Sequence, residues 1–411
     1  MPSRFPALLL ALLLPLVAPA SPVTPARPPG SIEVMVESGS LHGTIGTQPI
    51  RLDSFRIVDG RIDGFYCHAR DCQTGGVPRL RLDGGVNAQG QALIDETVDG
   101  VASGRWTLRR TADGWRGDWL SPDGRRRLPV DLRADGPRGP WEPRVFLDGP
   151  LPAQDDACMN TPGVVAIGIH RDGHRVQVLP AESQGSCDPY LPEVVDLDFD
   201  GHADLMLAQF LPAGPNIPYQ YWRQDPRTGL FEDISDLLGA VTSPEFDPAR
   251  QLIHTFSRGG AASHGVSVWR WVDGRLQEVE TRGSWFLDVR RNGRLRSCYV
   301  LPEYRDGRIV ETPRIIDGAD GRLRLEPDQD CQDADQPQGD GLLVWRHTPG
   351  RPPRAETIST RWYDRGPEHA RRWCRELPVL DLDHQRIDWV KAGESDAACE
   401  RTRPGLATAE G

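Results

Sequence analysis

The sequence is poor in lysine, which occurs only once, at Lys391, among 411 residues. Nearly all of its positive charge is arginine, and 48 Lys+Arg are outnumbered by 59 Asp+Glu, which gives a formal net charge of −11. Binding to nucleic acid or to an anionic membrane surface requires clustered positive charge. We therefore expect no nucleic-acid partner and no attraction to anionic lipid.

The sequence also lacks the short motifs of several common enzyme classes. Neither G-x-S-x-G nor H-E-x-x-H occurs, and there is no C-x-x-C, so serine-hydrolase, zinc-protease and zinc-cysteine signatures are missing. Many aspartates fall in Asp-Gly turns, where they serve backbone geometry. His170 and His174 flank such a turn and are expected to be exposed, and His264 is expected in a loop. We predict that the protein is not an enzyme.

Only one long hydrophobic run is present, and it lies at the N-terminus. Residues 7–17 (ALLLALLLPLV) follow Arg4 and precede a small-x-small sequence that ends at Ala20. This is the pattern of a secretory signal peptide, cleaved after Ala20. A membrane span needs about 20 apolar residues, and Pro15 and Pro19 interrupt this stretch. The sequence predicts a periplasmic protein without a membrane anchor after cleavage.

Export changes the interpretation of the cysteines. An oxidising compartment favours disulfides. The cysteines fall into pairs that are close in the sequence, and each pair flanks a segment about as long as one hairpin or loop. Sequence alone does not fix connectivity, so neighbour pairing is a hypothesis. The hypothetical pairs are Cys67–Cys72, Cys158–Cys187, Cys298–Cys331 and Cys374–Cys399.

Helical periodicity is almost absent, and short apolar alternations recur between turn dipeptides. Asp-Gly is frequent, for example at Asp59, Asp99 and Asp172. Such dipeptides supply the positive φ that tight hairpins need. We predict an all-β protein in which an antiparallel β-meander precedes a propeller-like or sandwich β domain.

Changes in composition divide the chain into segments. The expected order is a signal peptide (1–20), a Pro-rich leader (21–30), an N-terminal β module (31–135), a Pro/Gly-rich linker (136–156), a calcium-binding β domain (157–290), a C-terminal β region (291–402) and a tail (403–411).

The motif with the most chemical content is D-x-D-x-D-G-x-x-D at residues 196–204, between two apolar runs. Ca²⁺ takes six to eight oxygen ligands, many of them carboxylates, and Gly201 permits the turn that wraps the loop around an ion. An EF-hand would carry a glutamate where Leu207 stands, so we predict a strand-loop-strand calcium site of the integrin-like kind. The predicted ligands are Asp196, Asp198, Asp200, the backbone carbonyl of His202, and Asp204.

The alternative is an Asp-rich surface turn without a metal. Four carboxylates within nine residues repel one another when no cation is present, which favours the metal. A weaker version of the acidic motif occurs at Asp381 and Asp383, followed by Asp388. It has no glycine corresponding to Gly201, and we interpret it as an ordinary turn.

A Pro-rich loop over residues 211–218 follows the calcium motif and leads into Tyr219 and Tyr221. Stiff loops with tyrosines suit recognition because little entropy is lost on docking. The two tyrosines could equally pack on one face of a sheet, and the sequence leaves both interpretations open.

The central region resembles a known family. It contains VVDLDFDGHADL, then NIPYQYWRQDPRTGLFE, then PEFDPARQLIHTFSRGGAASHGVSVWRWVDGRLQEVE. Over roughly residues 160–282 it resembles the periplasmic immunity proteins that protect against peptidoglycan-hydrolase effectors of bacteria-killing type IV secretion, which are related to I-type lysozyme inhibitors. The front module, with SGRWTLRR and GDWLSPDGRRRLPVDL, is similar to the β-meander that often precedes this domain.

The resemblance implies a propeller-like domain with one Ca²⁺ and a loop whose tyrosine enters the cleft of a target glycosidase. The matching positions are Tyr219 or Tyr221, with Asn216 nearby. We therefore expect an exported calcium-binding protein that inhibits a peptidoglycan hydrolase. The alternative is an integrin-like, calcium-dependent envelope or adhesion module without a lytic target.

Overall fold

The computed structural model describes residues 26–69, 72, 80–152, 160–329, 331–365, 372–392 and 399–400. Within these residues it contains β-strands and one short 3-10 helix, η2 (Ser235–Leu237), and no α-helix. The all-β prediction is confirmed. The alternating apolar residues of the sequence place one side chain in two on a buried face, as a pleated strand requires.

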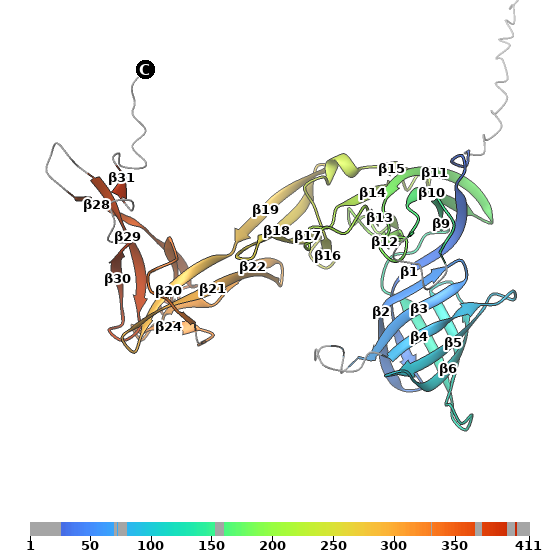
Figure 1. Cartoon of the computed structure of the whole chain (residues 1–411), viewed down its shortest axis with the longest axis horizontal. Coiled ribbons are helices and arrows are strands. Elements are labelled where there is room, and N and C mark those ends of the chain that lie inside the picture. Colours follow the sequence, from blue (N-terminus) through green and yellow to red (C-terminus); the bar gives the residue numbers. More distant parts are fainter. Residues whose placement is uncertain are drawn as a thin grey trace, which may run out of the picture.

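The first eight strands form a closed antiparallel barrel (Figure 1). Each strand pairs with the next, and β1 also pairs with β8 from Leu41 opposite Ala134 to Ile45 opposite Val130, which closes the sheet. The strands are β1 (Ile32–Ile45), β2 (Gln48–Val58), β3 (Arg61–His68), β4 (Leu80–Val86), β5 (Gln91–Val98), β6 (Val101–Arg110), β7 (Gly114–Leu120) and β8 (Arg127–Ala134).

Strand β1 belongs to two layers. Its register shifts between Gly39 and Leu41, and its first half leaves the barrel to pair with β9 (Glu142–Leu147). β9 then pairs with β10 (Val164–Arg171), and β10 pairs with β11 (His174–Ser183).

The segment predicted as a linker therefore contains a strand. Val145, Phe146 and Leu147 are fully buried, and their burial outweighs the turn-forming prolines and glycines around them. The Pro/Gly-rich composition describes the residues on either side of β9, 136–140 and 149–152.

Two four-stranded antiparallel sheets follow, each the size of a propeller blade. Their hydrophobic cluster includes Leu197, Met206, Tyr221 and Ile253. The first sheet contains β12 (Glu193–Val195), β13 (Asp204–Ala208), β14 (Tyr219–Gln224) and β15 (Phe231–Asp233). The second contains β16 (Pro244–Asp247), β17 (Leu252–Gly260), β18 (Ser263–Val272) and β19 (Arg275–Gly283).

The C-terminal strands form an eight-stranded and a four-stranded sheet around a separate core that includes Leu287, Val300, Val344 and Leu380. The larger sheet contains β20 (Trp285–Arg291), β21 (Arg294–Arg305), β22 (Arg308–Thr312), β25 (Gln332–Asp333), β28 (Arg361–Arg365), β29 (Arg372–Asp381), β30 (Arg386–Lys391) and β31 (Cys399–Glu400). The smaller contains β23 (Arg314–Asp317), β24 (Leu323–Glu326), β26 (Gly341–Arg346) and β27 (Arg354–Ser359).

The molecule is elongated. Figure 1 shows the barrel at one end, the sheets of β12–β19 in the middle and β28–β31 at the other end. The β21–β22 hairpin reaches back to the middle sheet, where the Tyr304 hydroxyl donates to Asp247 at 2.7 Å and the Ile309 N–H donates to Glu280 at 3.2 Å.

Three of the hypothetical cysteine pairs are bonded: Cys67–Cys72, Cys298–Cys331 and Cys374–Cys399. The remaining pair includes Cys158, which lies outside the described residues, as do the predicted signal peptide and tail. Disulfides indicate an oxidising environment. The described part of the chain contains no helix with the length and hydrophobicity that a bilayer span requires.

Candidate functional site

The acidic loop joins β12 to β13, and its backbone is shaped by its own carboxylates. Asp196 accepts hydrogen bonds from the N–H groups of Asp200 at 3.1 Å and Gly201 at 3.0 Å. Phe199 has φ 61° and Gly201 has φ 86°, so the chain turns sharply twice. The turn brings the start of the loop back toward its end.

Three of the predicted ligands lie together. Carboxylate oxygens of Asp196, Asp198 and Asp204 lie within 4.8 Å of one another, and the described residues contain no other cluster of three acidic, histidine or cysteine side chains with that geometry. Asp204 is completely buried at the start of β13 and accepts the N–H groups of Leu197 and Gln224, each at 2.8 Å. These bonds fix its position against the loop and against β14.

Asp198 is the residue of the cluster whose surroundings best fit a cation. Its Oδ1 atom is buried and has no hydrogen-bond partner within the described structure, and its Oδ2 atom lies 3.6 Å from Arg223 Nη1. A buried carboxylate oxygen without a partner is costly. A hard divalent cation between the three carboxylates would supply that partner, so the donor set fits Ca²⁺.

The pKa values of these carboxyl groups reflect the same crowding. Burial raises the pKa of Asp204 to about 7. Burial, followed by the neighbouring charge of Asp200, raises the pKa of Asp198. A bound divalent cation would oppose both effects by stabilising the ionised form.

The other two predicted ligands, Asp200 and His202, are arranged differently from the three clustered carboxylates. The Asp200 carboxylate accepts the His202 N–H at 2.8 Å and contacts its ring nitrogen Nδ1 at 3.2 Å, and Asp200 is not a member of the three-carboxylate cluster. Asp200 and His202 thus form a short local turn beside the cluster. Sequence spacing could not distinguish an aspartate that faces the cluster from one that caps its own turn.

The prediction that Tyr221 can enter a target cleft is wrong. Tyr221 is 1% exposed, and its hydroxyl donates to the Val241 carbonyl at 3.0 Å. Tyr219 is half-buried, its ring centroid lies 6.1 Å from that of Tyr221, and burial raises its pKa to about 12. Both tyrosines lie in β14 and pack on one face of the sheet against the same hydrophobic cluster, as in the alternative that the sequence left open.

Asn216 fastens the Pro-rich loop to the second sheet. Its Nδ2 donates to the Arg258 carbonyl at 3.0 Å and its Oδ1 accepts the Arg258 N–H at 2.8 Å. The groups that the loop presents to solvent are Phe210 and Leu211, which are 47% and 54% exposed. Sequence analysis missed them because they continue the apolar run of β13 and resemble the end of a buried strand.

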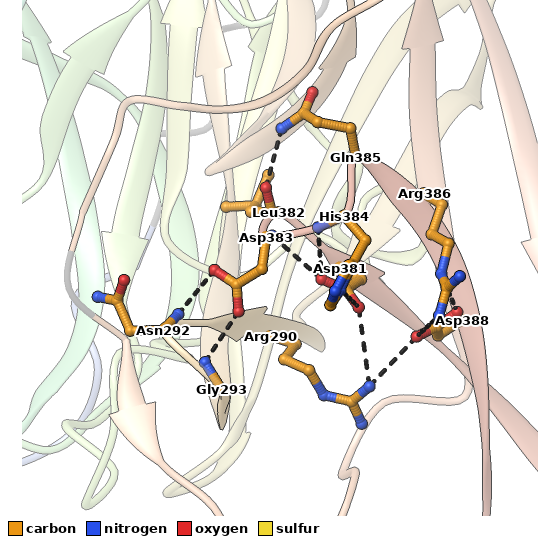
Figure 2. Close-up of polar contacts among 10 residues, drawn as sticks. All are labelled: Arg290, Asn292, Gly293, Asp381, Leu382, Asp383, His384, Gln385, Arg386 and Asp388. Carbon is orange, nitrogen blue, oxygen red and sulfur yellow. Dashed lines mark hydrogen bonds and ion pairs between the residues drawn. The ribbon is translucent and has the colours of Figure 1, made fainter.

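The weaker acidic motif is an ordinary turn. Figure 2 shows Asp381 between His384 and Arg290, and Asp383 directed at the Asn292–Gly293 turn. Asp381 accepts the His384 N–H at 3.0 Å, and Asp383 accepts the Gly293 N–H at 2.8 Å. These carboxylates are satisfied by the protein and fasten the β29–β30 turn to the β20–β21 turn.

Two histidines also depart from expectation. His264, expected in a loop, lies in β18, opposite Arg258 of β17, because the β17–β18 hairpin begins its return strand at Ser263. His174 is exposed as predicted, but His170 is 6% exposed, and its Nε2 lies 2.7 Å from Glu33 Oε1. The ring of His170 is held against Glu33 of β1, two strands away in the same sheet, so the side chain near the turn still lies inside the molecule.

Comparison with known proteins gives one match. Residues 286–404 match a family model described as a domain of unknown function (DUF8339). No curated protein and no solved structure matches the chain. The matched segment begins within β20 and extends past β31, so it coincides with the C-terminal sheets and their separate core.

Proposed function

We propose that the protein is an exported, calcium-stabilised binding protein that inhibits a peptidoglycan hydrolase. The observation that supports the calcium site is the three-carboxylate cluster with a buried, unpartnered oxygen on Asp198. Asp196, Asp198 and Asp204 would hold the ion. When bound, Ca²⁺ supplies a fixed charge that draws the carboxylates together and keeps the loop closed.

The calcium site is connected to the surface by one short strand. Asp204 begins β13, and β13 ends at Ala208, next to the Gln209–Pro218 loop. The Gln209 N–H donates to the Pro218 carbonyl at 2.9 Å, and this hydrogen bond joins the two ends of the loop. A cation that immobilises Asp204 therefore also immobilises the start of the loop.

The loop presents an apolar tip to a partner. Phe210 and Leu211 are exposed beside a rigid, proline-rich turn, and pre-ordered apolar groups bind without a large entropic penalty. Since Tyr221 is buried, we assign the contact with a target to Phe210 and Leu211.

The resemblance of the central region to immunity proteins selects a peptidoglycan hydrolase as the target. Glycosidases place two carboxyl groups across a cleft. Apolar side chains such as Phe210 and Leu211 that occupy this cleft would exclude the substrate. The net charge of −11 favours association with a basic lytic enzyme.

The proposal is tested by capture and inhibition with the mature full chain in Ca²⁺ buffer. Envelope and secreted fractions are passed over the immobilised protein, and any captured peptidoglycan hydrolase is assayed with and without the protein. We expect the F210A/L211A double variant to lose at least tenfold in inhibition. The control L237A removes another exposed leucine, 46% exposed, on η2, and should inhibit normally.

Two results contradict this proposal. One is equal inhibition by F210A/L211A and by L237A, which excludes the loop. The other is capture of glycans or surface proteins without any effect on lysis, which supports a calcium-dependent envelope or adhesion module instead.

A further inference from the structure

A cavity of about 580 Å³ lies between one end of the barrel and the β9–β11 layer. Its walls come from β1 where that strand leaves the barrel, from the 136–143 segment and from the Asp172–Gly173 turn. This volume is in the range of sites that hold small organic ligands. The barrel interior is a hydrophobic core in which Leu52, Leu82 and Trp106 are completely buried.

The cavity lining carries two arginines, Arg110 and Arg138, and three carboxylates, Glu37, Glu142 and Asp172, of which Glu142 and Asp172 are exposed. Glu37 has a side chain that is only 15% exposed, and it lies between Arg110 Nη2 at 3.4 Å and Arg138 Nη2 at 3.6 Å. Trp115 Nε1 also donates to it at 3.4 Å. A second carboxylate, Glu142, contacts Arg110 at 3.1 Å but is 53% exposed at the rim. Two guanidinium groups thus share one inner carboxylate and retain unused donors.

Two buried ring nitrogens at the cavity have no partner. Trp141 and His170 both line it and are 7% and 6% exposed. Trp141 Nε1 and His170 Nδ1 have no hydrogen-bond partner among the residues described. Buried polar atoms in native proteins are nearly always paired, and an acidic group in the cavity would accept a hydrogen bond from Trp141 Nε1. His170 Nε2 faces Glu33, so its Nδ1 is an acceptor and is not assigned to the anion.

Close packing and prolines hold the 136–143 segment of the cavity wall in one conformation. A Cβ added at Gly139 would lie 2.0 Å from Trp141 Nε1, so the indole packs directly on the glycine backbone and only glycine permits this contact. Pro137, Pro140 and Pro143 stiffen the same segment, and Phe55 adds an apolar surface at the barrel end. The wall therefore has a defined shape before any ligand arrives.

From these observations we propose that the cavity binds a small amphipathic anion. Its acidic group, a carboxylate, sulfonate or phosphate, contacts Arg138 and Arg110, which provide planar, charged donors. Its apolar body lies against Trp141, Phe55 and the prolines. The site includes no residue of the acidic loop, although Val194 of β12 contributes to its wall, and the proposal does not rest on the proposed inhibition.

The first test uses 8-anilinonaphthalene-1-sulfonate, a fluorescent amphipathic anion, with the mature full chain. We expect one saturable site per chain. The R138Q variant should bind the dye at least tenfold more weakly. R127Q is the matched control, because Arg127 pairs with Asp118 at 2.7 Å on the exposed barrel surface, and it should bind normally. Absence of saturable binding, or equal binding by R138Q and R127Q, overturns the proposal.

A competition measurement separates recognition from loss of structure in R138Q. Decanoate should displace the dye from the unmodified protein, whereas decanol, which has the same chain without the charge, should be at least tenfold less effective. The Trp141 indole N–H resonance, assigned with W141F, should shift on addition of decanoate. Equal displacement by decanol, or an unmoved Trp141 resonance, contradicts an anion site at this cavity.

Discussion

At the scale of single residues, one buried carboxylate organises the barrel interior. Glu96 is 2% exposed and accepts four hydrogen bonds. Their lengths are 2.9 Å from the Tyr66 hydroxyl, 2.7 Å from Trp106 Nε1, 3.0 Å from Trp119 Nε1 and 2.8 Å from the Ser103 hydroxyl. A buried carboxylate with all acceptors used is stable only while every donor remains in place.

Replacing this carboxylate should destabilise the barrel strongly. In E96Q the amide oxygen can replace only one carboxylate oxygen. If it takes the position of Oε2, which serves Tyr66, Trp106 and Trp119, these three hydrogen bonds lose the carboxylate charge, and the NH₂ group displaces the bond from the Ser103 hydroxyl. We expect a loss of about 2–4 kcal/mol in the free energy of unfolding, measured by denaturant titration with near-ultraviolet circular dichroism. E278Q, at an exposed position of β19, is the control. Identical unfolding curves for the two variants would refute this role of Glu96.

At the scale of strands and turns, much of the local structure could be predicted. The Asp-Gly dipeptides do supply positive φ: Asp59, Asp99 and Asp172 have φ of 50°, 51° and 50°. Each residue lies in a hairpin turn where the chain must reverse within two residues. These turns are local, so the residues that cause them lie next to the structure that they determine.

The pairing of distant strands could not be predicted. Period-two alternation tells which face of a strand is buried but not which strand lies beside it. The closure of β1 on β8 and the position of β9 beside β1 both depend on this long-range choice. The three-carboxylate cluster could be predicted because Asp196, Asp198 and Asp204 lie within nine residues. The burial of Tyr221 and His170 and the cavity beside Arg138 depend on long-range packing.

The Cys298–Cys331 disulfide should contribute most to the C-terminal sheets. It joins β21 to the residue before β25 across a sequence separation of 33, and long loops lose more entropy when they are closed in the unfolded chain. We expect C298A/C331A to lower the free energy of unfolding of this region by about 3–4 kcal/mol. The measurement is denaturant titration of the full chain under oxidising conditions.

The comparison variant is C67A/C72A, which opens a separation of only 5 residues and should cost about 2 kcal/mol, in the barrel. A larger loss in C67A/C72A than in C298A/C331A would contradict the loop-length explanation.

At the scale of the whole molecule, the C-terminal sheets form a unit of their own. Their hydrophobic cluster contains no residue from strands before β20, and the family match covers the same segment. Contacts to the middle sheet are made through the β21–β22 hairpin and are polar in the case of Tyr304 and Asp247. An independent core predicts independent folding.

A fragment of residues 284–403 should therefore fold without the rest of the chain. We expect a cooperative thermal transition and formation of the Cys298–Cys331 and Cys374–Cys399 disulfides, measured by circular dichroism and by mass spectrometry of the non-reduced fragment. A fragment that forms both disulfides yet melts without a cooperative transition would show that the middle sheet is needed for its core.

The central claim is that the acidic loop binds calcium, and calorimetric titration of the mature full chain with Ca²⁺ tests it most directly. We expect about one site per chain with a dissociation constant near 10⁻⁴–10⁻³ M, as in extracellular modules. D198N should abolish the binding heat, D200N should weaken binding less because Asp200 lies outside the three-carboxylate cluster, and D236N, at an exposed position on η2, should leave it unchanged. No binding heat together with no rise in melting temperature in excess Ca²⁺, or equal binding by D198N and D236N, would contradict the account.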